Sequence, residues 1–390
     1  MTNVMAYHFP RPVLASQYAA AMMGETPFTD APNGLFLAAP RRTGKSTFLQ
    51  LDLRPELERR GVLVIYVDLW ANQDYEPSEL IAITVAEALE AHRGLLHRAA
   101  KATGVESIAV AGIRFDTDKI GKKSGTTLHA ALHALQQVEK RPIAFIIDEA
   151  QHTLKTEAGN TTMKALKSAR DQMNGPSQHG LMLVMSGSDR DKLMRLVNNH
   201  DAAFFGSTVR DLPPLSQDFI AAIAALVEAQ HHALQPVDVG KMSQAFQLFG
   251  HRPQFFMQAI GDMLSPLADR GGRFEDRLLD AARQQQSADE AQMASDFLSL
   301  SALPRAVLWR ILEKGARFRP YDAAALAFYQ NVIGKKISPP LVKSALDTLR
   351  DRTPPLVWKS ARGEYAVDDL SMHHWYERHR DAGTWPPGSG

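Results

Sequence analysis

Short apolar runs alternate with longer amphipathic stretches between residues 34 and 212. The apolar runs cover residues 35–39, 62–69, 143–147 and 181–185, and residues 209–212, which end before Pro213 and Pro214, are a candidate for a fifth strand. The runs are continuously apolar, as is typical of strands that are buried on both faces. Between them, stretches such as 46–59 and 79–100 have helical spacing. This alternation predicts an α/β fold, a parallel sheet with helices on both faces.

The strand pattern stops after residue 216. Four segments with helical spacing follow, at 217–233, 238–249, 253–268 and 274–297, and they predict a helical lid. Three more helical segments follow at 304–314, 322–333 and 339–351, before two strand-like pieces at 356–360 and 365–367. Three helices and a hairpin predict a winged-helix domain.

We therefore expect five parts along the chain. They are an N-terminal helical segment (1–33), an α/β core (34–215), a helical lid (216–298), a winged-helix domain (299–380) and a disordered tail rich in Pro and Gly (381–390). Within the core, residues 102–125 contain four glycines and three lysines, which predicts an exposed loop.

The segment that joins the first strand to the first helix has the spacing of a phosphate-binding P-loop. It consists of Ala39, Pro40, Arg41, Arg42, Thr43, Gly44, Lys45, Ser46 and Thr47. In such a loop the backbone N–H groups and the helix N-terminus hold the β-phosphate, and Lys45 would bridge the β- and γ-phosphates. The Ser46 hydroxyl would bind Mg²⁺. Ala39 replaces the first glycine, so the chain must turn there without a positive φ. The alternative is a chance Gly-Lys-Ser at a helix start.

A second motif lies about 100 residues further along the chain. Residues 142–147 are a strand-like run that leads into Asp148 and Glu149. Asp148 would hold the magnesium shell, and Glu149 would orient the attacking water, because phosphoryl transfer depends on positioning and charge compensation. With the P-loop, the pair predicts an ATPase that binds ATP and Mg²⁺.

These two motifs resemble those of the AAA+ and STAND branch of P-loop ATPases. The similarity rests on residues 39–49 and 146–151, and it is greatest to the archaeal-type, transposition-type and origin-recognition ATPases. The resemblance implies an ATPase core followed by a lid and a winged helix. It also implies a molecular switch that assembles into homo-oligomers.

Three further residues take their expected roles from this resemblance. Ser186, or alternatively Ser188, would be a polar sensor of the γ-phosphate at a strand end; the alternative is a plain turn. Arg210 would reach the nucleotide of a neighbouring subunit as a catalytic arginine; the alternative is a surface or structural ion pair. Arg252 would touch the phosphates from the lid; the alternative is an ordinary helix start before Pro253.

The net charge of the whole chain favours no partner, but charge is unevenly distributed. The chain has 44 Lys and Arg against 43 Asp and Glu, whereas residues 300–380 have 14 against 8, a formal excess of +6. A winged helix places its third helix in the major groove of double-stranded DNA. The candidate phosphate contacts are Lys343, Arg350, Lys359 and Arg362. The alternative is that this domain packs against a protein partner.

Composition adds exclusions. The absence of cysteine excludes disulfides and thiolate chemistry, and it suits a cytoplasmic protein. The chain contains no run of 18 apolar residues, so we expect no membrane-spanning helix. We therefore expect an ATP-hydrolysing switch that engages DNA or a protein partner. The alternative is a nucleotide-gated scaffold or regulator with little turnover, which acts through protein contacts.

Overall fold

The computed structural model describes residues 7–72, 74–92, 109–110, 113–114, 127–175, 178–198, 200–265, 271–361 and 363–387. The chain divides into two compact units. The first unit contains Met1–Pro40 and Gly44–Pro213, and the second contains Arg41–Thr43 and Pro214–Gly390. Each unit is described by itself.

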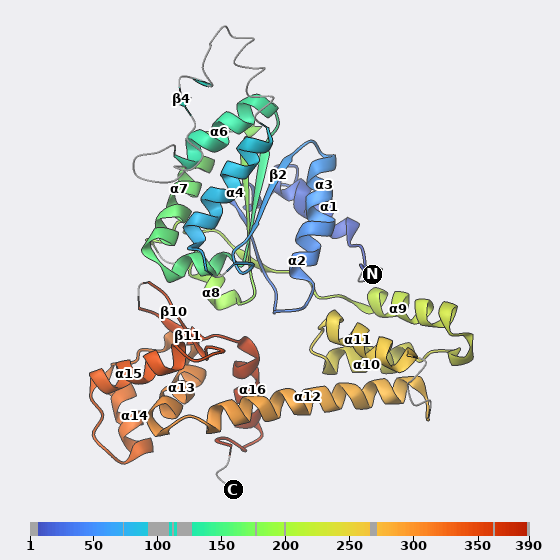
Figure 1. Cartoon of the computed structure of the whole chain (residues 1–390), viewed down its shortest axis with the longest axis vertical. Coiled ribbons are helices and arrows are strands. Elements are labelled where there is room, and N and C mark those ends of the chain that lie inside the picture. The colour runs from blue at the N-terminus through green and yellow to red at the C-terminus, as the bar shows by residue number, and fades with distance from the viewer. Residues whose placement is uncertain are drawn as a thin grey trace. The chain divides into compact units, whose positions relative to one another are not determined.

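A five-stranded parallel sheet forms the centre of the first unit (Figure 1). Its strands are β1 (Leu35–Ala38), β2 (Leu63–Asp68), β5 (Ile143–Asp148), β8 (Leu181–Gly187) and β9 (Val209–Asp211). Their spatial order is β2-β5-β8-β1-β9, and every neighbouring pair is parallel. The predicted α/β fold is confirmed: the four apolar runs are strands, and the candidate fifth strand is β9.

Helices cover both faces of this sheet, which explains why its strands are apolar at successive positions. On one face, Ala144 and Ile146 of β5 belong to the same core as α1 (Pro12–Met22) and α3 (Arg54–Arg59). Side chains alternate along a strand, so Phe145 and Ile147 face the opposite side. That side is covered by α4 (Pro77–Ala91), α6 (Leu128–Glu139) and α7 (Glu157–Met173).

The helical stretch after the P-loop is continuous but not uniform. It consists of α2 (Lys45–Phe48), a π-helical turn (Leu49–Leu53) and α3. Pro55 has no N–H to donate to the carbonyl four residues earlier, and its ring clashes with that carbonyl. The wider π turn immediately before Pro55 accommodates this defect without ending the helix.

The N-terminal helix α1 is part of the first unit's core and not a separate segment. Ala15, Ala19 and Met22 are buried against residues of β1 and α3. The buried Asp52 carboxylate accepts a hydrogen bond from the Arg11 backbone N–H at 2.9 Å, which holds the start of α1. Residues before and after the expected boundary at residue 33 therefore pack in the same core.

The remaining elements of the first unit are short. They are the 3₁₀ turns Ala31–Asn33 and Ala150–Lys155, the strand pairs β3 (Ala109–Val110) with β4 (Ile113–Arg114) and β6 (Asn174–Gly175) with β7 (Gln178–His179), and α8 (Arg190–Met194). The exposed loop predicted at 102–125 lies outside the described residues except for β3 and β4. The end of the predicted helix 79–100, beyond residue 92, also lies outside them.

The second unit begins with four helices where the sequence predicts them. They are α9 (Gln217–Gln230), α10 (Val239–Leu248), α11 (Pro253–Leu264) and α12 (Phe274–Leu298), with a 3₁₀ turn at His232–Leu234. Phe219, Phe246 and Phe256 meet in the centre with ring centroids 5.2–6.1 Å apart. Within the described part of the chain, no helix combines the length and apolar composition that a membrane crossing needs.

The C-terminal part of the second unit has the elements expected of a winged helix. They are α13 (Ala302–Lys314), a 3₁₀ turn (Gly315–Arg317), α14 (Ala323–Ile333), α15 (Pro339–Arg350), the antiparallel pair β10 (Val357–Lys359) and β11 (Tyr365–Val367), and α16 (Leu370–Asp381). Their core also contains Phe297 from the end of α12. The helix that closes the lid therefore also contributes to the C-terminal core.

The prediction of a disordered tail at 381–390 is wrong as far as residue 387. Trp385 packs against Phe297 and Tyr376, each with ring centroids 4.8 Å away, and against Trp375 at 5.2 Å. The prediction rested on the Pro and Gly content of the tail and did not weigh its one tryptophan. Burial of a tryptophan ring offsets the entropy lost when a few residues become ordered.

Candidate nucleotide-binding site

The P-loop connects β1 to α2, and its unusual backbone angles fall late in the loop. Arg42 has φ of 66° and Gly44 has φ of 92°, so the turn does not require a positive φ at Ala39. The expectation that Ala39 turns within the ordinary region is met. A Cβ placed on Gly44 would meet no atom within 4 Å, so the space beside this residue is open. A phosphate group needs such a space next to the N–H groups of the loop.

Lys45 is the most constrained charge of the site. Its side chain is only 5 % exposed. Its ammonium group contacts the Asp148 carboxylate, lies 2.9 Å from Glu149 Oε1 and donates to Ser186 Oγ at 3.2 Å. Burial alone would lower the pKa of Lys45, but the two carboxylates outweigh it, and the pKa is raised. Lys45 therefore stays charged, as phosphate binding requires.

Asp148, at the end of β5, is the centre of the hydrogen-bond network. Its Oδ2 accepts from the hydroxyls of Ser46 and Tyr66, the latter at 3.1 Å. Its Oδ1 accepts from Lys45 and from the Ser186 hydroxyl. Burial acts to raise the pKa of Asp148, but Lys45 and the hydroxyl donors hold it below its ordinary value. The carboxylate is therefore ionised at neutral pH.

These residues fit a magnesium ion. Mg²⁺ prefers hard oxygen ligands, and it is commonly held by one or two protein groups together with phosphate oxygens and water. The Ser46 hydroxyl and the ionised Asp148 carboxylate are in direct contact, so one ion could be shared between them. When bound, the ion would neutralise phosphate charge at this position.

Glu149 follows Asp148 in a left-handed conformation, with φ of 58°. Its Oε1 faces Lys45, while its Oε2 accepts from the Ser188 hydroxyl at 2.7 Å and from the Gln151 side-chain amide. Gln151 is 2 % exposed and also donates to Ser188 Oγ at 3.3 Å. Both oxygens of Glu149 are thus occupied by groups of the protein itself.

Sequence reasoning missed two members of this network. Tyr66 lies in β2. Gln151 lies two residues after Glu149, and it enters the sequence-based predictions only as the last residue of the family motif 146–151. Tyr66 could have been noticed as a hydroxyl-bearing side chain within the apolar strand β2, which lies beside the strand that ends at Asp148. The register pairs Tyr66 with Ile146, two residues before Asp148, and a sequence does not reveal this register.

Arg210 forms an ion pair within its own chain. Its guanidinium contacts the Asp30 carboxylate and donates to Thr29 Oγ1 at 3.2 Å. Asp30 also accepts from the Thr208 N–H at 2.8 Å. This is the ion pair that stands as the alternative to a catalytic arginine. The catalytic role of Arg210 stays a prediction, and it requires that this ion pair opens.

Arg252 precedes α11 in the second unit. Its guanidinium donates to the Phe249 carbonyl and to Asp289 at 2.7 Å each, and it stacks on the Phe255 ring at 4.4 Å from the centroid. Pro253 is the first residue of α11, as the alternative of an ordinary helix start expects. Phosphate contact by Arg252 stays a prediction.

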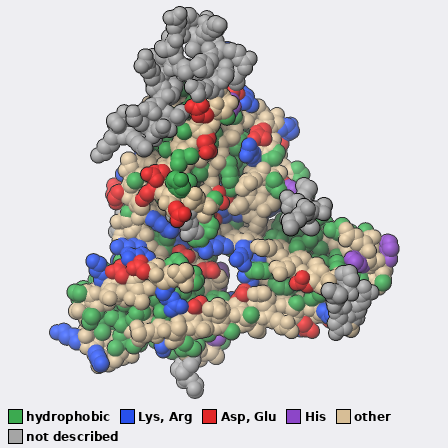
Figure 2. All heavy atoms as spheres, in the orientation of Figure 1, with side chains coloured by type: hydrophobic (Ala, Val, Ile, Leu, Met, Phe, Trp, Pro, Cys, Tyr) green, Lys and Arg blue, Asp and Glu red, His purple; other side chains and the backbone are tan. Residues whose placement is uncertain are grey.

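The candidate DNA contacts of the second unit differ in their surroundings. Lys343 is exposed on α15, whereas Arg350 pairs with Asp347 at 3.0 Å and Asp351 at 2.8 Å. Lys359 lies over the Tyr365 ring at 5.7 Å. Arg362 lies outside the described residues. On the face drawn in Figure 2, Lys and Arg side chains over the C-terminal helices are interspersed with Asp and Glu.

Comparison with known proteins agrees with the geometry of the site. Residues 30–196 match the family described as the AAA domain. No curated protein matches the sequence. Among solved structures, the ADP form of the Aeropyrum pernix ORC2 protein is similar at 14% identity, with a TM-score of 0.51, covering 99% of this chain and 97% of that one. The Aeropyrum pernix ORC1 protein in complex with DNA is 15% identical, with a TM-score of 0.43 and coverage of 98% and 96%.

The two findings support different statements. The matched family segment includes the P-loop, Asp148 and Glu149, so the AAA+ resemblance inferred from these residues is confirmed. The similarity to the ORC2 structure extends over almost the whole chain and shows a shared fold.

Proposed function

We propose that this protein binds ATP with Mg²⁺ and hydrolyses it, because residues 30–196 match the AAA domain family. The observation that carries the proposal is the convergence of Lys45, Ser46, Asp148 and Glu149 at the carboxyl ends of β1 and β5. Two motifs about 100 residues apart become one buried network beside an open P-loop.

Each residue has a separate task in the proposed reaction. The loop N–H groups and Lys45 bind the phosphates, and Ser46 and Asp148 hold the ion. Glu149 orients the attacking water. In the described state Glu149 is bound to Lys45, Ser188 and Gln151. When Lys45 turns to the phosphates, Oε1 of Glu149 loses its partner and can accept a hydrogen bond from water, while Ser188 and Gln151 hold Oε2.

Nucleotide binding and phosphate release in the full-length protein test this proposal. Lys45→Ala should abolish both, because the buried ammonium is the main counter-charge for the phosphates. Glu149→Gln should keep ATP affinity but lower turnover by at least ~100-fold, as expected for loss of a positioned general base. Wild-type turnover in both variants would contradict the assignment of this site.

We further propose that hydrolysis depends on homo-oligomers, with Arg210 reaching a neighbour's nucleotide. This requires the partly buried Arg210–Asp30 ion pair, and the hydrogen bond of Arg210 to Thr29, to open. Turnover per subunit should rise with protein concentration, and Arg210→Ala should remove the rise. Asp30→Asn, which frees the guanidinium, should shift the rise to lower concentration. Turnover per subunit that is flat with concentration would exclude the idea.

DNA engagement by the second unit is proposed from its charge. Residues 300–380 carry 14 basic against 8 acidic residues, and Lys335, Lys336 and Lys343 are exposed between α14 and the first turns of α15. A mobility shift with double-stranded DNA should weaken with salt and be lost in a Lys343→Glu/Lys359→Glu variant. Absence of a shift in every nucleotide state would favour a protein partner.

The engagement of both Glu149 oxygens favours a second candidate function, a nucleotide-gated scaffold or regulator with little turnover. Such a protein would bind ATP tightly and change its partner contacts without releasing phosphate. Tight binding with undetectable phosphate release, at every protein concentration and with DNA present, would favour this function over the ATPase.

A further inference from the structure

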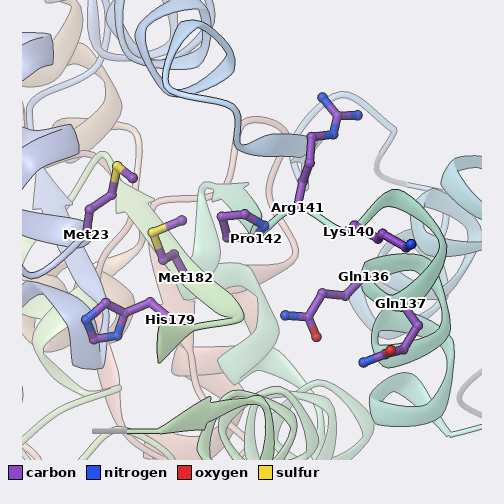
Figure 3. A pocket seen from close by; sticks show the side chains of 8 residues that line it. All are labelled: Met23, Gln136, Gln137, Lys140, Arg141, Pro142, His179 and Met182. Carbon is purple, nitrogen blue, oxygen red and sulfur yellow. The ribbon is translucent and has the colours of Figure 1, made fainter. Parts of the chain in front are cut away.

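Polar side chains diverge at the amino ends of β5 and β8 and converge at their carboxyl ends. At the amino ends, a cavity of about 560 Å³ has Lys140 and His179 in its lining (Figure 3). These two side chains point away from each other, so they do not meet on one ligand. At the carboxyl ends, Gln151 and Ser188 both donate to one oxygen of Glu149. The convergent groups at the carboxyl ends therefore have a common target.

The carboxylate of Glu149 fixes the orientation of the Gln151 amide. Gln151 Nε2 lies 2.5 Å from Glu149 Oε2 and 3.3 Å from Ser188 Oγ. A carboxylate only accepts hydrogen bonds, so the nitrogen of the amide, and not its oxygen, faces Glu149. The Ser188 hydroxyl donates to the same Oε2 at 2.7 Å. Two donors, one after β5 and one after β8, thus hold a single oxygen of Glu149.

This orientation leaves the carbonyl end of the Gln151 amide in an unfavourable position. Gln151 is 2% exposed, and no described residue donates a hydrogen bond to its Oε1. A buried carbonyl oxygen without a donor destabilises a folded protein. An apolar side chain of the same length would avoid this loss, so packing alone does not explain a glutamine at this position. The glutamine adds the hydrogen bond to Glu149, which an apolar side chain cannot make.

Gly187, the last residue of β8, provides the space that this amide occupies. The φ of Gly187 is not positive, so the backbone conformation does not require glycine here. A Cβ at this position would lie 2.6 Å from Gln151 Oε1. Glycine within a strand often marks a place where another group closely approaches the backbone. The end of β8 is thus shaped to admit the Gln151 amide next to Glu149.

The two oxygens of Glu149 have different partners. Oε1 faces the Lys45 ammonium at 2.9 Å, while Oε2 faces Gln151 and Ser188. Because Oε2 is held, the carboxylate cannot rotate freely about its Cγ–Cδ bond, and Oε1 keeps one position. When Lys45 turns to the phosphates, a water molecule can donate a hydrogen bond to Oε1 at that position. An acceptor that is fixed in advance accelerates attack, because the water is already oriented when the reaction begins.

We propose that Gln151 is a positioning residue for ATP hydrolysis, which holds Oε2 of Glu149 so that Oε1 is presented to the attacking water. This inference rests on the proposed function, in which Glu149 orients that water. Gln151 acts through Glu149 and not on the phosphates, so it affects turnover and not the affinity for ATP. Ser188 shares Oε2, and its removal leaves the Gln151 contact in place.

Gln151→Met in the full-length protein separates positioning from packing. Methionine has a similar length and fills core space well, but it has neither the N–H donor nor the buried carbonyl. Turnover at saturating ATP should fall about tenfold, as expected for the loss of a hydrogen bond to a charged group. The KM for ATP should stay at its wild-type value, and the midpoint of thermal unfolding should not fall. Gln172→Met, at an exposed position on α7, should leave all three quantities unchanged.

A double-variant cycle shows whether Gln151 acts through Glu149. In a Glu149→Gln background, Gln151→Met should lower turnover no further, because the carboxylate that it positions is absent. Phosphate release from radiolabelled ATP resolves the low rates of these variants. Wild-type turnover in Gln151→Met, an equal loss in both backgrounds, or a lower midpoint of unfolding that accounts for the loss would overturn the inference alone. Unchanged turnover in Glu149→Gln, or no turnover in the wild type, would overturn the proposed function and this inference with it.

Discussion

Two ion pairs, one in each unit, have opposite surroundings. In the first unit, Lys45 and Asp148 are almost completely buried, and each has several partners. In the second unit, Arg350 and Asp347 are 39% and 35% exposed and pair on one helix face. A buried charge that loses its partner destabilises the fold strongly. An exposed ion pair contributes little to stability, because water solvates both charges when the pair is broken. The first arrangement fixes the geometry of the site, whereas the second contributes little to stability.

The largest effect is expected from Asp148→Asn. The amide keeps the shape of Asp148 but removes the charge that faces Lys45, so the unfolding free energy should fall by about 2–3 kcal/mol. Turnover that depends on Mg²⁺ should fall by at least ~100-fold, because the ion loses an anionic ligand. Denaturant unfolding and phosphate release measure the two effects. Asp347→Asn, the matched exposed change, should leave both near wild type, and equal losses in the two variants would remove the contrast between the units.

Apolar packing, and not charge, should hold the second unit together. Trp385→Ala removes a ring that contacts Phe297, Trp375 and Tyr376. Trp385 is partly buried, so the unfolding free energy should fall by about 2 kcal/mol. Val332→Ala, at a position that is 44% exposed, should cost less than about 0.5 kcal/mol. Equal stability of the Trp385 variant and the wild type in chemical denaturation would show that the tail contributes nothing.

The two serines after β8 should have opposite effects on turnover. Ser186 contacts Lys45 and Asp148, and Ser186→Ala should lower turnover about tenfold by loosening both groups. Ser188 holds Glu149, and Ser188→Ala should raise turnover about threefold by removing one of the two side-chain donors to Oε2 of Glu149. Steady-state phosphate release at saturating ATP measures both. A loss of turnover in Ser188→Ala would instead assign the sensor role to Ser188.

The smallest effect is expected at an exposed ion pair. Arg350→Ala breaks its pairs with Asp347 and Asp351, yet it should change the unfolding free energy by less than about 0.5 kcal/mol. Because those carboxylates already neutralise Arg350, DNA affinity should also change little, whereas Lys343→Ala should reduce the salt dependence of binding by about one charge. Thermal unfolding and salt-dependent mobility shifts measure the two effects. A stability loss above about 1 kcal/mol would place Arg350 among the structural residues.

The sequence by itself determined the fold class and the core of the candidate site. Continuous apolar runs predicted four of the five strands of the sheet, because strands buried on both faces need apolar side chains at successive positions. Lys45, Ser46, Asp148 and Glu149 were found because phosphate and magnesium chemistry requires these residue types at fixed places relative to a strand and a helix. The helices of the second unit were also read from their periodicity, with boundaries that shift by a few residues.

Only the tertiary structure decided which other groups join them. Strand register, which brings Tyr66 beside Asp148, depends on long-range packing and leaves no local signal. The same is true of Ser188, whose contact to Glu149 depends on the end of β8 lying beside the end of β5. Trp385 reads as part of a flexible tail until its aromatic partners are known. Local sequence determines elements and motifs, whereas partners far apart in the chain meet only through the packing of the whole unit.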